Sequence, residues 1–160
     1  MSRFADRVVL VTGASSGIGA ELAREFAQEG ADLVLTARRV PRLEELAEIR
    51  TLGRRALVVV CDVTQDGALE RAVGQGTEAF GRLDVVVANA GFGVVGSFER
   101  LTLDDYRRQF ETNVFGVLRT ARAALPALRR SRGTLVIIGS VSGHVLRHAD
   151  VDVFVAHSPA

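Results

Sequence analysis

Short runs of aliphatic and β-branched residues alternate along this chain with longer stretches whose apolar residues recur at helical spacing. The runs have the length and composition of buried strands, and they cover residues 8–12, 33–36, 56–60, 83–88 and 134–138. Strands that alternate with helices pair in parallel and need a helix layer on both faces. The pattern therefore predicts an α/β fold, a doubly wound, Rossmann-like parallel sheet that is truncated after about five strands.

Helices are expected between these strands, over residues 17–30, 41–53, 64–80 and 102–130. Gly74 and Gly76 lie inside the third helix, where each costs about 1 kcal/mol relative to Ala. Thr102 and Asp105 have the spacing of a variant capping box at the start of the fourth helix. Pro126 is expected to kink or end that helix, because it lacks an amide proton and clashes with the preceding turn.

The composition excludes several classes of protein. The chain has 160 residues, which suits a single domain over residues 1–160, and it combines 48% hydrophobic residues with a formal net charge of +1. This balance argues against a disordered chain and against a broadly cationic nucleic-acid binder. The first apolar run is too short for a signal peptide, and no run approaches about 18 residues, so no membrane span is expected. The single Cys61 fits a cytoplasmic protein, and we expect it to be a buried small hydrophobe.

A glycine-rich loop, T-G-A-S-S-G-I-G, joins the first expected strand to the first expected helix. Such a loop lets backbone amides approach a pyrophosphate, and the helix N-terminus adds partial positive charge. The first glycine permits a tight turn, the second a close approach, and the third close helix packing. The loop predicts cofactor binding by Gly13, Ser15, Ser16, Gly17, Ile18 and Gly19. The alternative is an ordinary glycine-rich turn.

The end of the second expected strand indicates which nucleotide would bind. An NAD site usually has an acidic residue there to accept a hydrogen bond from the ribose 2′-hydroxyl. This chain has L-T-A-R-R instead, so Arg38 and Arg39 can pair with a 2′-phosphate through their planar guanidinium groups. NADP (NADPH) is therefore predicted over NAD. The alternative is a solvated charge pair like Arg54 and Arg55.

Further motifs follow the glycine loop in order: C-D-V-T from residue 61, A-N-A-G from residue 88, T-N-V-F-G from residue 112 and I-I-G-S-V-S-G from residue 137. Together with the loop they resemble the short-chain dehydrogenase/reductase family over about residues 5–145, and residues 146–160 form a divergent tail. The resemblance implies an NADP-dependent oxidoreductase that transfers a hydride between the nicotinamide and a small carbonyl or alcohol substrate.

The resemblance also implies roles for single residues. Asp62 and Val63 would flank the adenine, whereas the other cofactor-lining residues would be Asn89, Ala90 and Gly91. Asn113 would hold a proton-relay water, and Ser140 would hydrogen-bond the reacting oxygen of the substrate. Four of these residues also have a purely structural alternative. Asp62 could be a loop cap, Asn89 a turn residue, Asn113 a helix-kink residue and Ser140 a strand-end hydroxyl.

The tail departs from the family where its general acid should lie. Family members follow the serine with Tyr-x-x-x-Lys, in which the tyrosine is the general acid/base and the lysine lowers its pKa and holds the nicotinamide ribose. Here F-V-A-H-S places Phe154 and Ser158 at those positions, and all 20 basic residues of the chain are Arg. The single tyrosine, Tyr106, is expected to pack in the long helix. We therefore expect the chain to be catalytically impaired.

Two other interpretations stay open beside that of an impaired oxidoreductase: a non-catalytic nucleotide-binding or interaction module, and a truncated pseudo-enzyme fragment. In each, the fifth strand is expected to be an open apolar edge that promotes association, including homo-oligomers. His144 and His148 have the i, i+4 spacing of metal ligands, but no carboxylate motif accompanies them, so no metal site is expected. The substrate is not indicated.

Overall fold

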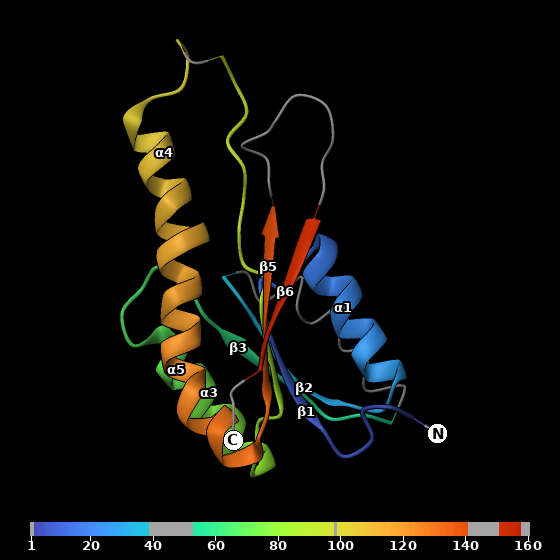
Figure 1. Ribbon diagram of the computed structural model, residues 1–160. Helices are drawn as coiled ribbons and strands as arrows, with labels where there is room; N and C mark the ends of the chain where they lie inside the picture. The colour runs from blue at the N-terminus through green and yellow to red at the C-terminus, as the bar shows by residue number, and fades with distance from the viewer. Residues whose placement is uncertain (1, 39–52, 98, 141–150, 158–160) are drawn as a thin grey trace.

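The computed structural model describes residues 2–38, 53–97, 99–140 and 151–157 (Figure 1). Several sequence predictions lie outside these residues. They are Arg39, His144, His148, Ser158 and the helix expected over residues 41–53, of which only Gly53 is described.

A single six-stranded sheet forms the centre of the molecule, in the order β3-β2-β1-β4-β5-β6. The strands are β1 (Val8–Thr12), β2 (Asp32–Ala37), β3 (Ala56–Val60), β4 (Val85–Ala88), β5 (Thr134–Ser140) and β6 (Val151–His157). All pairs from β3 to β5 are parallel, whereas β5 and β6 are antiparallel. The predicted parallel α/β sheet is confirmed, and the order of the strands reverses between β1 and β4. Ligands of such sheets bind at this reversal, beyond the carboxyl ends of the strands.

Helices cover both faces of the sheet, α1 (Gly17–Gln28) on one face, and α3 (Ala68–Phe80) and α5 (Gly116–Ser131) on the other (Figure 1). Successive side chains of a strand point to opposite faces, so β1 contributes to two cores. Val9 and Val11 belong to the core under α1, and Leu10 belongs to the core under α3 and α5. Each of these three residues is fully buried. This two-sided burial explains why the strands are continuous apolar runs.

The helix expected over residues 102–130 consists of three segments. α4 (Leu103–Phe110) leads into a π-helical turn, η2 (Glu111–Phe115), and then into α5. The predicted capping box is confirmed, since Thr102 and Asp105 each accept a hydrogen bond from the other's backbone amide. The expectation that Pro126 could end the helix is wrong, because α5 continues to Ser131. Ala124 and Ala127 are buried on either side of the proline and hold these turns against the core.

The third helix begins later than the sequence pattern predicts, at Ala68 rather than at residue 64. Thr64 does not cap it. Instead, the Thr64 amide and hydroxyl both donate to the Asp62 carboxylate, at 2.9 and 2.8 Å, and close a turn after β3. Side chains of Asp and Thr commonly compete for the backbone in this way. The outcome is a longer loop at the carboxyl end of the sheet.

The expected open edge at β5 is wrong, because β6 pairs along the whole of that strand (Figure 1). The pairing runs from Thr134 opposite His157 to Ser140 opposite Val151. Residues 151–157 of the divergent tail form this strand. Its β-branched alternation at residues 151, 153 and 155 is strand-forming, and an uncovered strand edge offers it backbone partners. The outermost strand on this side of the sheet is therefore β6.

Two glycines of α3 have different surroundings. A Cβ on Gly76 would lie 2.8 Å from Cγ2 of Val34, whereas a Cβ on Gly74 would meet no described atom within 4 Å. Gly76 is buried and Gly74 is exposed. Gly76 therefore lets α3 lie close to β2, and Gly74 only weakens the helix.

We expect Gly74→Ala to raise the free energy of unfolding by about 0.5–1 kcal/mol, because it reduces the backbone entropy of the unfolded chain. Gly76→Ala should lower it by about 1–3 kcal/mol, because the added methyl group displaces Val34. Urea unfolding of the two matched variants measures both values. Equal shifts in the same direction would show that packing against β2 does not distinguish the glycines.

A buried carboxylate ties together the amino-terminal ends of β1 and β4. Asp84 is 3% exposed and accepts hydrogen bonds from the Val8 amide at 3.0 Å, from Arg7 at 3.0 Å and from Arg82 at 2.8 and 2.5 Å. Burial raises the pKa of the Asp84 carboxyl, but the hydrogen bonds from Arg82, the Val8 amide and Arg7 outweigh it. The net pKa therefore lies below the ordinary value of 3.8.

Asp84→Asn is expected to lower the free energy of unfolding by about 2 kcal/mol near neutral pH. This is less than the loss expected for a fully buried ion pair, because both arginines are half exposed. A lowered folded-state pKa gives stability that is complete above the unfolded pKa of about 3.9 and is lost as pH falls through the folded value. The difference between wild type and variant should therefore shrink below about pH 4. Urea unfolding across this range, with exposed Asp104→Asn as the control, tests it. A constant difference down to about pH 2 contradicts it.

Candidate functional site

The Thr12 hydroxyl joins the carboxyl ends of β1 and β4. It accepts hydrogen bonds from the Asn89 amide at 2.9 Å and from the Ala90 amide at 3.0 Å, and it donates to the Val87 carbonyl at 3.3 Å. The Asn89 side chain returns a hydrogen bond to the Thr12 carbonyl at 3.0 Å. Thr12 is 1% exposed. Because these groups lie where the strand order reverses, the start of the glycine loop is held rigidly against the loop after β4.

The glycines of the loop serve different geometric needs. Gly13 and Gly17 have φ angles of +65° and +56°, the left-handed region that disfavours other residues. A Cβ on Gly13 would lie 2.8 Å from Cα of Ala90, and one on Gly19 would lie 2.5 Å from Nδ2 of Asn89. A Cβ on Gly17 would meet no described atom within 4 Å. Gly13 and Gly19 are thus required by packing, whereas Gly17 faces open space.

The amino-terminal end of α1 is left open at this loop. Ser16 occupies the N-cap position in an extended conformation, yet its side chain makes no capping hydrogen bond, and the first turn has no acidic residue. Ile18 is 48% exposed beside it. Unsatisfied amides at a helix N-terminus carry partial positive charge and favour an anion. The geometry of the residues predicted to bind a pyrophosphate therefore fits such a group.

A cleft of about 420 Å³ lies at the carboxyl ends of β2 and β3. Its lining residues are Arg38, Asp62, Thr64, Phe92, Arg107, Arg108, Glu111 and Thr112. Arg38 directly follows β2, and Asp62 lies just after β3. Val63 is 6% exposed, and a Cβ on Gly116 would lie 2.7 Å from its Cγ2, so the Val63 side chain packs against α5.

Asn113 lies in η2 and holds the segment after β4. Its Oδ1 accepts from the Phe92 amide at 3.0 Å, and its Nδ2 donates to the Phe92 carbonyl at 2.8 Å. A Cβ on Gly91 would lie 3.1 Å from Asn113 Oδ1. Gln109, which sequence reasoning missed, similarly accepts from the Val94 amide at 3.0 Å. The irregular turn orients Asn113 toward this segment, as π-helical turns often do at functional sites.

Ser140 and Phe154 lie at different levels of the β5–β6 pair. Ser140 is the last residue of β5 and pairs with Val151, whereas Phe154 pairs with Ile137. Phe154 therefore lies further back along the sheet than Ser140. The backbone at Phe154 is a strand and not a helix, the element in which side chains four residues apart share a face.

Tyr106 and Cys61 differ in how deeply they are buried. Tyr106 on α4 is half-buried. Cys61 is 4% exposed, and burial followed by the nearby Asp62 charge raises the pKa of its thiol to about 11. The thiol stays protonated near neutral pH, which confirms the prediction of a small buried hydrophobe.

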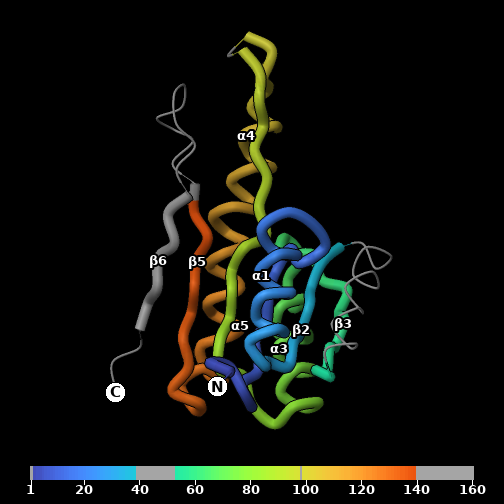
Figure 2. Tube along the Cα trace, turned by 90° about the vertical axis from the view of Figure 1, so that its right-hand side faces the viewer, coloured from blue at the N-terminus to red at the C-terminus, as the bar shows by residue number. Residues whose placement is uncertain are grey.

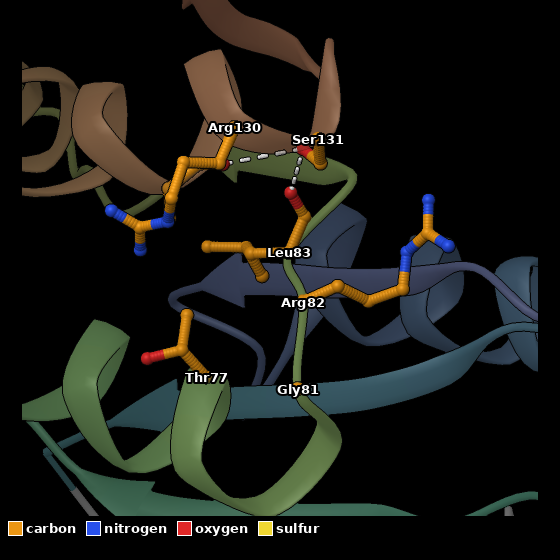
Figure 3. Close-up of a pocket in the computed structure, with 7 residues that line it drawn as sticks. Thr77, Gly81, Arg82, Leu83, Arg130 and Ser131 are labelled. Carbon is orange, nitrogen blue, oxygen red and sulfur yellow. Dashed lines mark hydrogen bonds between the residues drawn. The ribbon is translucent and has the colours of Figure 1, made fainter.

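A second cavity, of about 360 Å³, lies at the opposite end of the sheet, beside the end of α3 and the segment that leads into β4 (Figure 3). The Ser131 hydroxyl donates to the Leu83 carbonyl at 2.5 Å and closes one wall. The guanidinium groups of Arg82 and Arg130 point away from each other, to opposite sides (Figure 3). Convergent polar groups are the mark of a binding site, and this arrangement does not provide them.

The described part of the chain holds no cluster of three or more His, Cys, Asp or Glu side chains arranged for a metal ion. Among those same residues, no helix combines the length and the apolar character needed to cross a membrane.

A doubly wound parallel sheet with a glycine loop after its first strand defines a nucleotide-binding α/β protein of the Rossmann type. The family model described as short chain dehydrogenase matches residues 7–151. The chain therefore belongs to the short-chain dehydrogenase family of oxidoreductases.

Known relatives agree with this assignment. The chain is 48% identical over 139 residues to 11-beta-hydroxysteroid dehydrogenase 1A of Arabidopsis thaliana, covering 84% of this chain and 39% of the relative. An alcohol dehydrogenase of the archaeon Thermococcus sibiricus, complexed with 5-hydroxy-NADP, has a TM-score of 0.82 and 37% identity, over 88% of this chain and 61% of its own. A short chain dehydrogenase of Burkholderia cenocepacia J2315, in complex with NADP, has a TM-score of 0.81 and 35% identity, over 92% and 60%. The chain thus spans 39% to 61% of the length of these proteins.

Thr12→Val is expected to lower the free energy of unfolding by about 1–3 kcal/mol, because it leaves the Asn89 and Ala90 amides without their acceptor. Thr12→Ser keeps the hydroxyl and should retain most of the stability. Thr36→Val is a matched control, since Thr36 is equally buried but its hydroxyl makes a hydrogen bond of 3.4 Å to the Val11 carbonyl. Urea unfolding compares the three variants. An equal loss in Thr12→Val and Thr36→Val would refute a special role for Thr12.

Proposed function

We propose that this chain binds NADP(H) in preference to NAD(H), as the nucleotide-binding unit of a short-chain oxidoreductase. The observation that carries the proposal is Arg38, which follows β2 and lines the cleft at the position where NAD sites use an acidic residue. Arg38 makes no ion pair with the residues that the structure describes. The NADP complex of the Burkholderia relative and the 5-hydroxy-NADP complex of the Thermococcus relative support the same cofactor.

The glycine loop and α1 would hold the pyrophosphate through backbone amides. Gly17 supports this, because the space beside it is open where a phosphate would approach. Arg38 and Arg39 would pair with the 2′-phosphate, and Asp62 and Val63 would border the adenine. In this proposal residues 1–160 act as one nucleotide-binding domain, and the chain acts in the cytoplasm.

The nicotinamide, when bound, supplies or accepts a hydride for a small carbonyl or alcohol. Toward that chemistry the chain offers the loop Asn89–Gly91 beside the cofactor, Asn113 as the group that holds a relay water, and the Ser140 hydroxyl as a hydrogen-bond donor to the reacting oxygen. Phe154 cannot donate a proton, and Ser158 carries no charge. Since a positioned acid or base contributes roughly 10²–10⁴-fold, we propose that this chain reduces carbonyls poorly.

A non-catalytic nucleotide-binding module is the second candidate function, favoured by the position of Phe154 in β6 and not in a helix. Both candidates require cofactor binding. They differ in turnover, so NADPH oxidation with a small aldehyde or ketone separates them. Rapid turnover would contradict the proposed impairment, and tight binding without turnover favours the module.

Titration of the purified chain, followed by nicotinamide fluorescence, should show saturable binding of NADPH that is tighter than that of NADH. Arg38→Gln should weaken NADPH binding by about tenfold, the effect of one lost charge-assisted pair, and leave NADH binding nearly unchanged. Arg129→Gln, which removes an exposed charge near the carboxyl end of α5, is the control. Equal affinities of the wild-type chain for the two cofactors would contradict the preference.

A further inference from the structure

The cleft beside Arg38 has a second source of guanidinium groups. α4 rises beyond the carboxyl ends of the strands (Figure 2), and Arg107 and Arg108 of this helix line the same cleft as Arg38. These arginines come from an element that sequence reasoning did not connect with the nucleotide. Arg38 follows β2, so the cleft receives positive charge from both the sheet and α4.

The carboxylates of the cleft are already engaged by other groups. Asp62 accepts two hydrogen bonds from Thr64, and Glu111 forms an ion pair of 2.7 Å with Arg119, which lies outside the lining. Neither carboxylate is paired with a lining arginine in the described structure. Asp62 keeps its charge, because its donors are neutral, but three lining arginines against two carboxylates still leave the lining with a net positive charge, which favours an anion.

Arg107 and Arg108 can turn to such an anion at little cost. They pair with Asp104 at 2.8 Å and with Asp105 at 2.5 Å, each three residues earlier on α4. The Arg107–Asp104 pair is exposed on both sides, at 73% and 80%, and such pairs contribute little to stability; Arg108 is 69% exposed, and its partner Asp105 is 24% exposed and keeps its hydrogen bonds to Thr102 when Arg108 turns away. Neither aspartate lines the cleft.

Hydrogen bonds stabilise both ends of the helix that carries these arginines, although none of its residues is buried. The Thr102–Asp105 capping box fixes its first turn, and the hydrogen bond from the Val94 amide to Gln109 ties its last turn to the loop after β4. The position of α4 relative to the cleft is therefore set by the fold. Only the arginine side chains need to move.

We propose that Arg107 and Arg108 complete the 2′-phosphate subsite and, with Arg38, set the preference for NADP over NAD. A phosphate monoester carries nearly two negative charges and presents several acceptor oxygens. One guanidinium engages at most two of them in a bidentate pair, so a second element can bind the remaining oxygens. This inference rests on the proposed function, because it assigns two further specificity residues to the same nucleotide site.

The test uses the double variant Arg107→Gln/Arg108→Gln in the full chain, with four probes: NADPH, NADH, 2′,5′-ADP and 5′-AMP. We expect the dissociation constants of NADPH and 2′,5′-ADP to rise about tenfold, and those of NADH and 5′-AMP to stay within about twofold. Arg107→Lys/Arg108→Lys should lose less, because it keeps the charge but not the bidentate geometry. Arg129→Gln, at the far end of α5, should change none of the four.

The outcomes separate this inference from the proposed function. If wild type binds NADPH more tightly than NADH and the double glutamine variant keeps that ratio, the role of α4 is refuted while the proposed function stands. A parallel loss for all four probes also refutes it, since a structural role would weaken both cofactors. No saturable NADPH binding by wild type overturns both proposals.

Discussion

The hydrogen bonds of one buried hydroxyl group hold the two halves of this site together. Thr12 ends β1, and its side chain binds the first amides of the loop after β4, while Asn89 returns a hydrogen bond to the Thr12 carbonyl. The close approach of the two loops then excludes a side chain at Gly13 and Gly19. The loop is fixed by packing on one side only. Its other side therefore leaves the N-terminus of α1 and the space beside Gly17 open.

A second set of contacts forms the outer wall of the site. Asn113 and Gln109 use their amide groups to hold the backbone after β4, and the π-helical turn η2 places Asn113 for that purpose. The same helix carries Arg107 and Arg108 to the cleft beside Arg38. The segment that supports the loop thus also contributes charge to the cleft that we propose binds the nucleotide.

The divergent tail has a structural consequence of its own. In pairing with β5, β6 covers the strand edge that the parallel sheet would otherwise expose, and it does so with an antiparallel strand. Phe154 then lies in a strand and not in a helix, the element in which side chains four residues apart share a face. The backbone that would bring a tyrosine and a lysine together is absent from the described tail. This supports the proposed loss of catalysis independently of the side chains themselves.

The sequence by itself determined the parallel α/β sheet, the glycine loop, the capping box of α4 and the burial of Cys61. Each depends on local periodicity or on neighbours close in the chain, which a sequence pattern records directly. The tertiary structure decided that α3 begins at Ala68, that α5 continues through Pro126 and that β6 covers β5. It also brought α4 to the cleft beside Arg38. These outcomes depend on contacts between segments distant in sequence, where packing and unpaired backbone groups outweigh local propensity.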